Sequence, residues 1–83
     1  MSAYKILNKS HDEILGRIGL ALLQVKCERR LTLDDMGREL ERDRQSIANY
    51  ISGDNAMDVV TWFYAVAAWP EITSKLAEAE GRS

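Results

Sequence analysis

Four side chains near the middle of the chain have the types and the spacing that reading DNA bases requires. Arg44 and Ala48 are four positions apart, as are Gln45 and Asn49, so on an α-helix the four side chains share one face. Arginine pairs with guanine, glutamine and asparagine pair with adenine, and a small apolar side chain can touch a thymine methyl group. A solvated polar helix face has a similar composition. The pattern alone therefore leaves both base reading and simple exposure open.

Such a face needs a helix, and residues 32–53 predict two helices joined by a turn. Thr32 and Asp43 are of the types that cap helix N-termini. Gly53 can adopt the left-handed conformation that ends a helix. Apolar residues recur at helical spacing on both sides of an interruption at residues 41–43, namely Leu33, Met36, Leu40, Ile47, Tyr50 and Ile51. We therefore expect one helix that ends at Leu40 and a second over residues 44–52, the arrangement of a helix-turn-helix unit, whose second helix usually enters the DNA major groove.

A long helix is expected before this pair. Ser10 followed by Glu13 matches the capping box that begins a helix. We expect this helix to run to about residues 27–30. Its core face should contain Ile14, Leu15, Ile18, Ala21, Leu22 and Val25. Gly16 and Gly19 lie three positions apart inside it, where they are either tolerated or permit close approach of another helix.

Two more helices are expected after the pair. Asp58 caps a helix that extends to residue 69. Its predicted core stripe consists of Val59, Trp62, Phe63, Val66 and Trp69. Pro70 stops this helix and suits the first turn of a last helix over residues 71–80. Ile72, Leu76 and Ala79 share one face of that last helix.

The composition favours one small all-α domain. The 83 residues contain 46% hydrophobic and 29% charged residues and a single proline, which suits a folded chain with one modest core. We expect the domain at residues 10–80, an N-terminal arm at residues 1–9 and a flexible C-terminal end at residues 81–83. Residues 1–10 lack an apolar signal core, the longest apolar run is far short of a membrane span, and Cys27 is the only cysteine. We therefore expect a cytoplasmic protein.

The charges restrict where DNA could bind. The formal net charge is −2 and the sequence pI is about 5.3, whereas non-specific DNA binding depends on excess positive charge. Six basic residues lie between residues 26 and 44, interleaved with acids, and the C-terminal third is acidic. A face that meets DNA should therefore come from the middle of the chain.

Residues for enzymatic chemistry are scarce. His11 and Cys27 are the only residues of their types, and neither has a second ligand or base at a useful spacing. Glycine-rich phosphate loops are absent. We expect no enzyme, no metal site and no cofactor.

Three stretches carry the features of one known family: IGLALLQVKCERRLTLDDMGREL, RDRQSIANYISGD and MDVVTWFYAVAAW. They contain a first helix ending in basic residues, the helix-turn-helix pair, a Tyr-x-Ser-Gly exit and an apolar fourth helix. Over about residues 15–68 the chain therefore resembles the lambda repressor/Cro-like (XRE-type) helix-turn-helix family of bacterial and phage regulators. The resemblance implies a compact five-helix domain that regulates transcription in a repressor-like manner and inserts the helix at residues 44–52 into double-stranded DNA. The residues themselves leave repressor and activator open as alternatives.

Transferred residue by residue, the resemblance implies base contacts at Arg44, Gln45, Ala48 and Asn49. It implies flanking phosphate contacts at Arg30, Arg38, Arg42, Ser46 and Ser52.

The chain departs from the family pattern in two places. The turn has Glu41-Arg42 where the family has glycine followed by an apolar residue, and Leu33 stands where many members have a phosphate-binding glutamine. We interpret Arg42 and Arg38 as replacement phosphate contacts.

Two functions follow as alternatives. The first is a sequence-specific DNA-binding regulator that forms a homodimer on a two-fold operator. A chain of this size cannot easily bury all its aromatic residues, so the expected dimer interface contains Trp62, Tyr64 and Trp69. The second is a protein-interaction module with the same fold and no DNA role, which uses the aromatic helix at residues 58–69.

Overall fold

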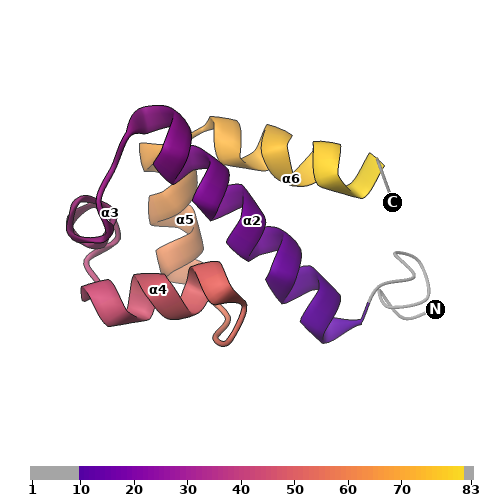
Figure 1. The fold of residues 1–83 in the computed structure, drawn as a ribbon, viewed down its shortest axis with the longest axis horizontal. Helices are drawn as coiled ribbons and strands as arrows, with labels where there is room; N and C mark the ends of the chain where they lie inside the picture. Colours follow the sequence, from indigo (N-terminus) through magenta and orange to yellow (C-terminus); the bar gives the residue numbers. More distant parts are fainter. Residues whose placement is uncertain (1–9, 82–83) are drawn as a thin grey trace.

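The computed structural model describes residues 10–81, and the side chains of residues 10–77. Within this part the chain forms five helices and no strand (Figure 1). They are α2 (His11–Arg29), α3 (Leu33–Leu40), α4 (Arg44–Ser52), α5 (Val59–Ala68) and α6 (Glu71–Gly81). The expected all-α fold is confirmed. The predicted arm at residues 1–9 and the last two residues lie outside the described part, and α6 runs one residue past its expected end.

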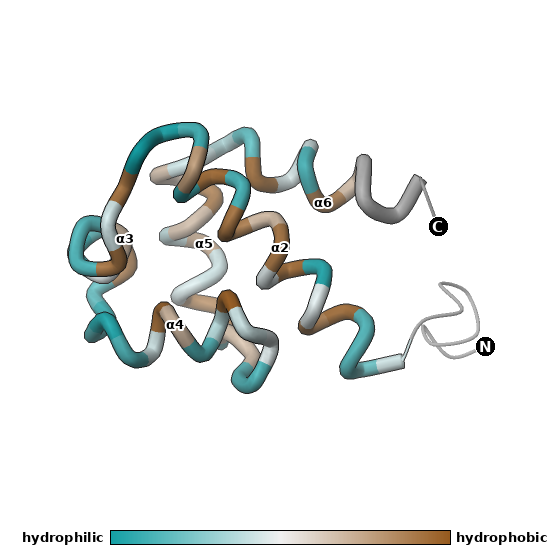
Figure 2. Tube along the Cα trace, viewed as in Figure 1, coloured by the Kyte–Doolittle hydropathy of each residue, from teal (hydrophilic) through white to brown (hydrophobic). Residues whose placement is uncertain are grey.

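The longest helix, α2, crosses the middle of the molecule (Figure 1). It packs against α4 on one side and α6 on the other, while α3 packs against α4 and α5. Hydrophobic positions recur along α2 where it passes through the centre, and the connection between α3 and α4 is hydrophilic (Figure 2). The core that results joins all five helices and contains Ala21, Leu22, Val25, Met36, Leu40, Ile47, Tyr50, Ala65, Trp69 and Ile72.

Side-chain caps begin four of the helices where the sequence predicts them. The Ser10 hydroxyl accepts a hydrogen bond from the Glu13 backbone N–H at 3.2 Å. Thr32 and Asp35 form a full capping box, with each side chain accepting from the other residue's backbone N–H at 3.0 and 2.9 Å. Asp43 and Asp58 accept from the third residue of their helices at 2.9 and 3.0 Å. These contacts satisfy backbone N–H groups that a helix start otherwise leaves unpaired.

The buried face of α5 differs from the predicted stripe. Trp69 is 2% exposed, as predicted, and Trp62 and Val66 pack against the core as partly buried residues. Thr61 and Ala65, which the stripe did not include, are 1% and 0% exposed. Val59 and Phe63, which were expected in the core, are 69% and 66% exposed. The pattern could not select a face because α5 contains no charged residue and only one strongly polar position, Thr61. The small side chains of Thr61 and Ala65 face the core, and the larger Val59 and Phe63 are turned outward.

This rotation of α5 changes the predicted dimer interface. Trp69 lies in the core and has no surface to offer to a second chain. Trp62 is partly buried, and Tyr64 is 41% exposed. Tyr64 is exposed together with Val59, Val60 and Phe63, and these four residues form the exposed apolar face of α5.

Among the side chains that the structure describes, Arg29 and Glu28 of α2 form ion pairs with α6. The Arg29 guanidinium donates from Nε and Nη2 to the two carboxylate oxygens of Glu71 at 2.6 and 2.8 Å. Lys75 donates to Glu28 at 2.5 Å. The hydrogen bonds from Arg29 lower the pKa of Glu71 to about 2. The last helix is therefore held to α2 by paired charges as well as by Ile72.

This depressed pKa predicts an acid-dependent loss of stability. The contribution of the Arg29–Glu71 pair is fully present above the ordinary pKa of a glutamate, near 4.5, and is lost as the pH falls toward about 2. We expect Glu71→Gln to reduce the free energy of unfolding at pH 7 and to flatten its dependence on pH between these values. Urea unfolding at pH 7, 4.5 and 3 measures this. Glu41→Gln, in an exposed turn, is the matched control, and an equal effect of the two substitutions would contradict the prediction.

Candidate nucleic-acid interface

A three-residue turn, Glu41 to Asp43, joins α3 to α4. In Figure 1, α3 is seen nearly along its axis while α4 runs across the view, so the two helices cross steeply. Glu41 adopts the left-handed conformation with φ of 55°, which glycine, the family's residue at this position, adopts without steric cost. The Arg42 backbone N–H donates to the Gly37 carbonyl at 2.9 Å and closes the end of α3.

Gly37 allows this turn to fold back on α3. A Cβ atom at Gly37 would lie 2.5 Å from the Arg42 carbonyl oxygen, a separation that requires the backbone to shift. The structure shows that the close neighbour is the backbone of the connecting turn, which sets where α4 begins.

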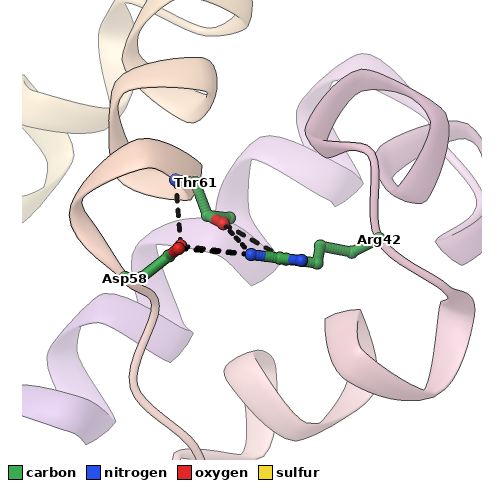
Figure 3. Close-up of polar contacts among 3 residues, drawn as sticks. All are labelled: Arg42, Asp58 and Thr61. Carbon is green, nitrogen blue, oxygen red and sulfur yellow. Dashed lines mark hydrogen bonds and ion pairs between the residues drawn. The ribbon is translucent and has the colours of Figure 1, made fainter.

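Arg42 anchors the turn to α5 (Figure 3). Its guanidinium donates to the Thr61 hydroxyl from Nη2 at 3.0 Å and from Nε at 3.2 Å. It also donates to both carboxylate oxygens of Asp58 at 3.3 Å. Thr61 is almost fully buried, so the arginine satisfies a core hydroxyl and the residue that caps α5 at the same time. An aliphatic residue could fill space at this position but could make neither hydrogen bond.

Arg42 and Asp58 each stay charged because of the groups around them. The negative charge of Asp58 raises the pKa of Arg42, and hydrogen bonds from Thr61 lower the pKa of Asp58. The predicted phosphate contact of Arg42 is untested, but the guanidinium already has a carboxylate partner while its side chain is 40% exposed. A phosphate at Arg42 would have to share it with Asp58.

The predicted base-contact residues lie together on one side of α4. Arg44 and Gln45 are exposed, and Ala48 and Asn49 are partly exposed. The Gln45 side-chain amide donates to the Asn49 side-chain oxygen at 3.2 Å, which links two groups suited to adenine. Arg44 approaches Asp34 at 3.9 Å, and both side chains are more than 60% exposed, so this ion pair is weak. The structure thus presents an arginine and an amide pair outward from a helix whose other side carries the buried Ile47 and Tyr50.

The predicted phosphate-contact residues are more scattered. Arg38 forms an ion pair with Asp35 in α3. Arg30 is exposed at the left-handed C-terminus of α2. The Ser52 hydroxyl donates to the Asp54 carboxylate at 2.9 Å, and the Ser46 backbone N–H donates to Asp43. Only Arg38 and Arg42 meet Arg44 around one open hollow of about 530 Å³, whose walls also contain three acids, Asp34, Glu41 and Asp43.

Sequence reasoning missed two features of this region. The first is the contact of Arg42 with Asp58 and Thr61, residues that lie 16 and 19 positions away. An arginine where the family pattern has an apolar residue was the available signal, but nothing local identified its partner. The second is a groove between α2 and the exposed side of α4, lined by residues of α2, of the α2–α3 connection, of α3 and of α4.

Comparisons of the chain with protein-family models, with curated proteins and with solved structures find no match. The resemblance to the lambda repressor/Cro-like family therefore remains a prediction that rests on the quoted stretches. In the part of the chain that the structure describes, no helix has the length and apolar character needed to cross a membrane. In the same residues no group of three His, Cys, Asp or Glu side chains could hold a metal ion.

Proposed function

We propose that this chain is a sequence-specific DNA-binding regulator of transcription that inserts α4 into the major groove. The observation that carries the proposal is the outward face of α4, where Arg44, Gln45, Ala48 and Asn49 project together. Ile47 and Tyr50 fix the rotation of α4 from the buried side. An exposed helix of this kind, entered through a short turn, has the geometry by which helix-turn-helix proteins read base edges.

The charge distribution sets the expected character of this binding. The net charge is −2, and two of the arginines beside the turn are already paired with Asp35 and Asp58. Few phosphates can therefore be neutralised, so non-specific affinity should be low and the salt dependence shallow. Discrimination would come from base contacts, chiefly those of Arg44 and the linked Gln45 and Asn49.

Selection of bound sequences from a random double-stranded DNA pool tests the proposal. We expect a defined sequence to be enriched, and on that sequence Arg44→Ala should cost about 1–3 kcal/mol of binding free energy. It should also relax the preference at one base pair. Binding curves for the selected sequence and its single-base variants measure both effects.

Gln24→Ala is the control, because Gln24 is exposed on α2 and lies outside the α4 face. It should leave affinity and preference unchanged. Absence of any enriched sequence even at low salt would refute the proposal, and unchanged preference in Arg44→Ala would remove Arg44 as a base reader.

We include homodimer formation in the proposal, with the exposed apolar face of α5 as the interface. Val59, Val60, Phe63 and Tyr64 form this face, and α5 carries no charged residue. Two copies could therefore pair there without repulsion between like charges. A two-fold operator follows from a two-fold dimer, so a palindrome among the selected sequences would support it.

A protein-interaction module without a DNA role is the second candidate, and the same exposed face of α5 favours it. Exposed apolar patches often mark protein contacts. If no DNA sequence is enriched and a protein partner is recovered in a pull-down that Phe63→Glu abolishes, this second function replaces the first.

A further inference from the structure

An open groove of about 520 Å³ separates the C-terminal half of α2 from α4. Its walls come from α2, from the α2–α3 connection with the start of α3, and from the exposed side of α4. Its lining consists of Leu23, Lys26, Leu31, Thr32, Leu33, Arg44, Ala48, Ile51 and Ser52. The floor is apolar and the volume is in the range of small-molecule sites.

The charge of this groove is the reverse of that of the whole chain. The residues that line it in the described part of the protein include two cations and no acid, although the chain has 13 acidic and 11 basic residues. Lys26 lies on α2 and Arg44 at the start of α4, so the cations stand on different walls. Lys26 makes no ion pair with any described residue. Asp34 lies 3.9 Å from Arg44, and because both side chains are exposed this ion pair is weak.

The hollow around the α3–α4 turn, by contrast, contains acids as well as arginines. It has nearly the same volume, but Asp34, Glu41 and Asp43 stand among its arginines and would repel an anion. In the groove between α2 and α4, an apolar floor occurs together with Lys26 and with Arg44, which Asp34 pairs only weakly. A ligand that matches both features has an apolar body and one negative group.

We infer that this groove binds small amphiphilic anions, such as a medium-chain carboxylate, with the apolar body against Leu23, Leu33 and Ile51 and the carboxylate near Lys26 and Arg44. Arg44, Ala48 and Ser52 line the groove and also belong to the predicted DNA-contact residues. A bound anion therefore occupies the guanidinium of Arg44, which α4 would otherwise place against a DNA base. The groove is then a site through which such a ligand releases DNA, a consequence that rests on the proposed function.

Titration with octanoate, without DNA and below its micellar concentration, tests the site directly. Amide NMR shifts should concentrate on residues that line the groove. Octanol, which has no charge, should bind about two- to fivefold more weakly than octanoate, as expected for loss of an exposed ion pair. Lys26→Gln should lower the affinity for octanoate by a similar factor and leave that for octanol unchanged.

Two substitutions on α2 separate the groove from the rest of the surface. Leu23 lines the groove and is 39% exposed, whereas Leu20 is 47% exposed and lies outside it. Leu23→Asp should reduce octanoate binding about tenfold or more because it places a like charge against the apolar floor. Leu20→Asp should change it less than about twofold, because an exposed charge outside the groove is screened by solvent.

Shifts that cluster on α5, equal binding of octanoate and octanol, or an unchanged affinity in both Leu23→Asp and Lys26→Gln would overturn the inference. DNA-binding measurements with and without octanoate test the consequence. Octanoate should weaken the affinity of the wild-type chain for the selected DNA sequence, and it should leave the affinity of the Leu23→Asp variant unchanged. Octanoate that fills the groove without affecting DNA affinity would overturn the regulatory part. If no DNA is bound at all, the proposed function fails while the octanoate titration still decides the site.

Discussion

Trp69→Ala is expected to lower the free energy of unfolding by about 3–5 kcal/mol, and Phe63→Ala by less than about 0.5 kcal/mol. Both substitutions remove a large aromatic side chain from the α5 region, but Trp69 is 2% exposed and Phe63 is 66% exposed. Trp69 also packs in the core cluster, which contains Ile72 of α6 and residues of α2. Its removal leaves a cavity that this small core cannot fill. Urea unfolding monitored by circular dichroism measures both values.

A loss of this size approaches the total stability of many domains, so Trp69→Phe provides a folded comparison with a smaller loss. The unfolding is measured at low protein concentration, because a concentration-dependent effect of Phe63→Ala would identify Phe63 as part of a dimer interface. Equal losses in the two alanine variants at low concentration would instead support the stripe that the sequence pattern predicted for α5, and would contradict the rotation seen in the structure.

The helix boundaries were predictable because their signals are local. Ser10, Thr32, Asp43 and Asp58 each cap a helix through a hydrogen bond to a residue three positions later. A sequence shows such a pair directly. The face of α5 was not predictable in this way. Its ten residues are nearly all apolar, so the rotation depends on which side chains fit against α3 and α6.

The candidate DNA face was predictable for the same local reason, since Arg44, Gln45, Ala48 and Asn49 share a helix face by spacing alone. The partners of Arg42 were not, because Asp58 and Thr61 meet it only after α5 folds against the turn. The groove between α2 and α4 likewise depends on contact between helices that are distant in sequence. Leu23 and Lys26 line one groove with Arg44 only after the chain has folded.

Gly19 and Gly16 provide the second prediction, because they are equivalent in the sequence and different in the structure. Both lie inside α2, three residues apart. A Cβ atom at Gly19 would lie against the Ile51 carbonyl oxygen and 2.8 Å from that of Tyr50, whereas a Cβ atom at Gly16 would meet nothing within 4 Å. We expect Gly19→Ala to lower the free energy of unfolding by about 1–3 kcal/mol through overpacking. Gly16→Ala should raise it by about 0.5–1 kcal/mol because alanine favours the helix interior.

Urea unfolding of the two variants, side by side, measures the difference in sign. The same substitution should also affect the DNA face. The neighbours of Gly19 are backbone oxygens at the end of α4, so space for a Cβ atom can open only if α4 itself moves. Gly19→Ala should therefore shift α4 relative to α2 and weaken binding of the selected DNA, while Gly16→Ala leaves that binding unchanged. A gain of stability in both variants would show that α4 does not pack on Gly19 as the structure has it. A loss in Gly19→Ala without any change in DNA affinity would separate the stability of α2 and α4 from the reading of DNA.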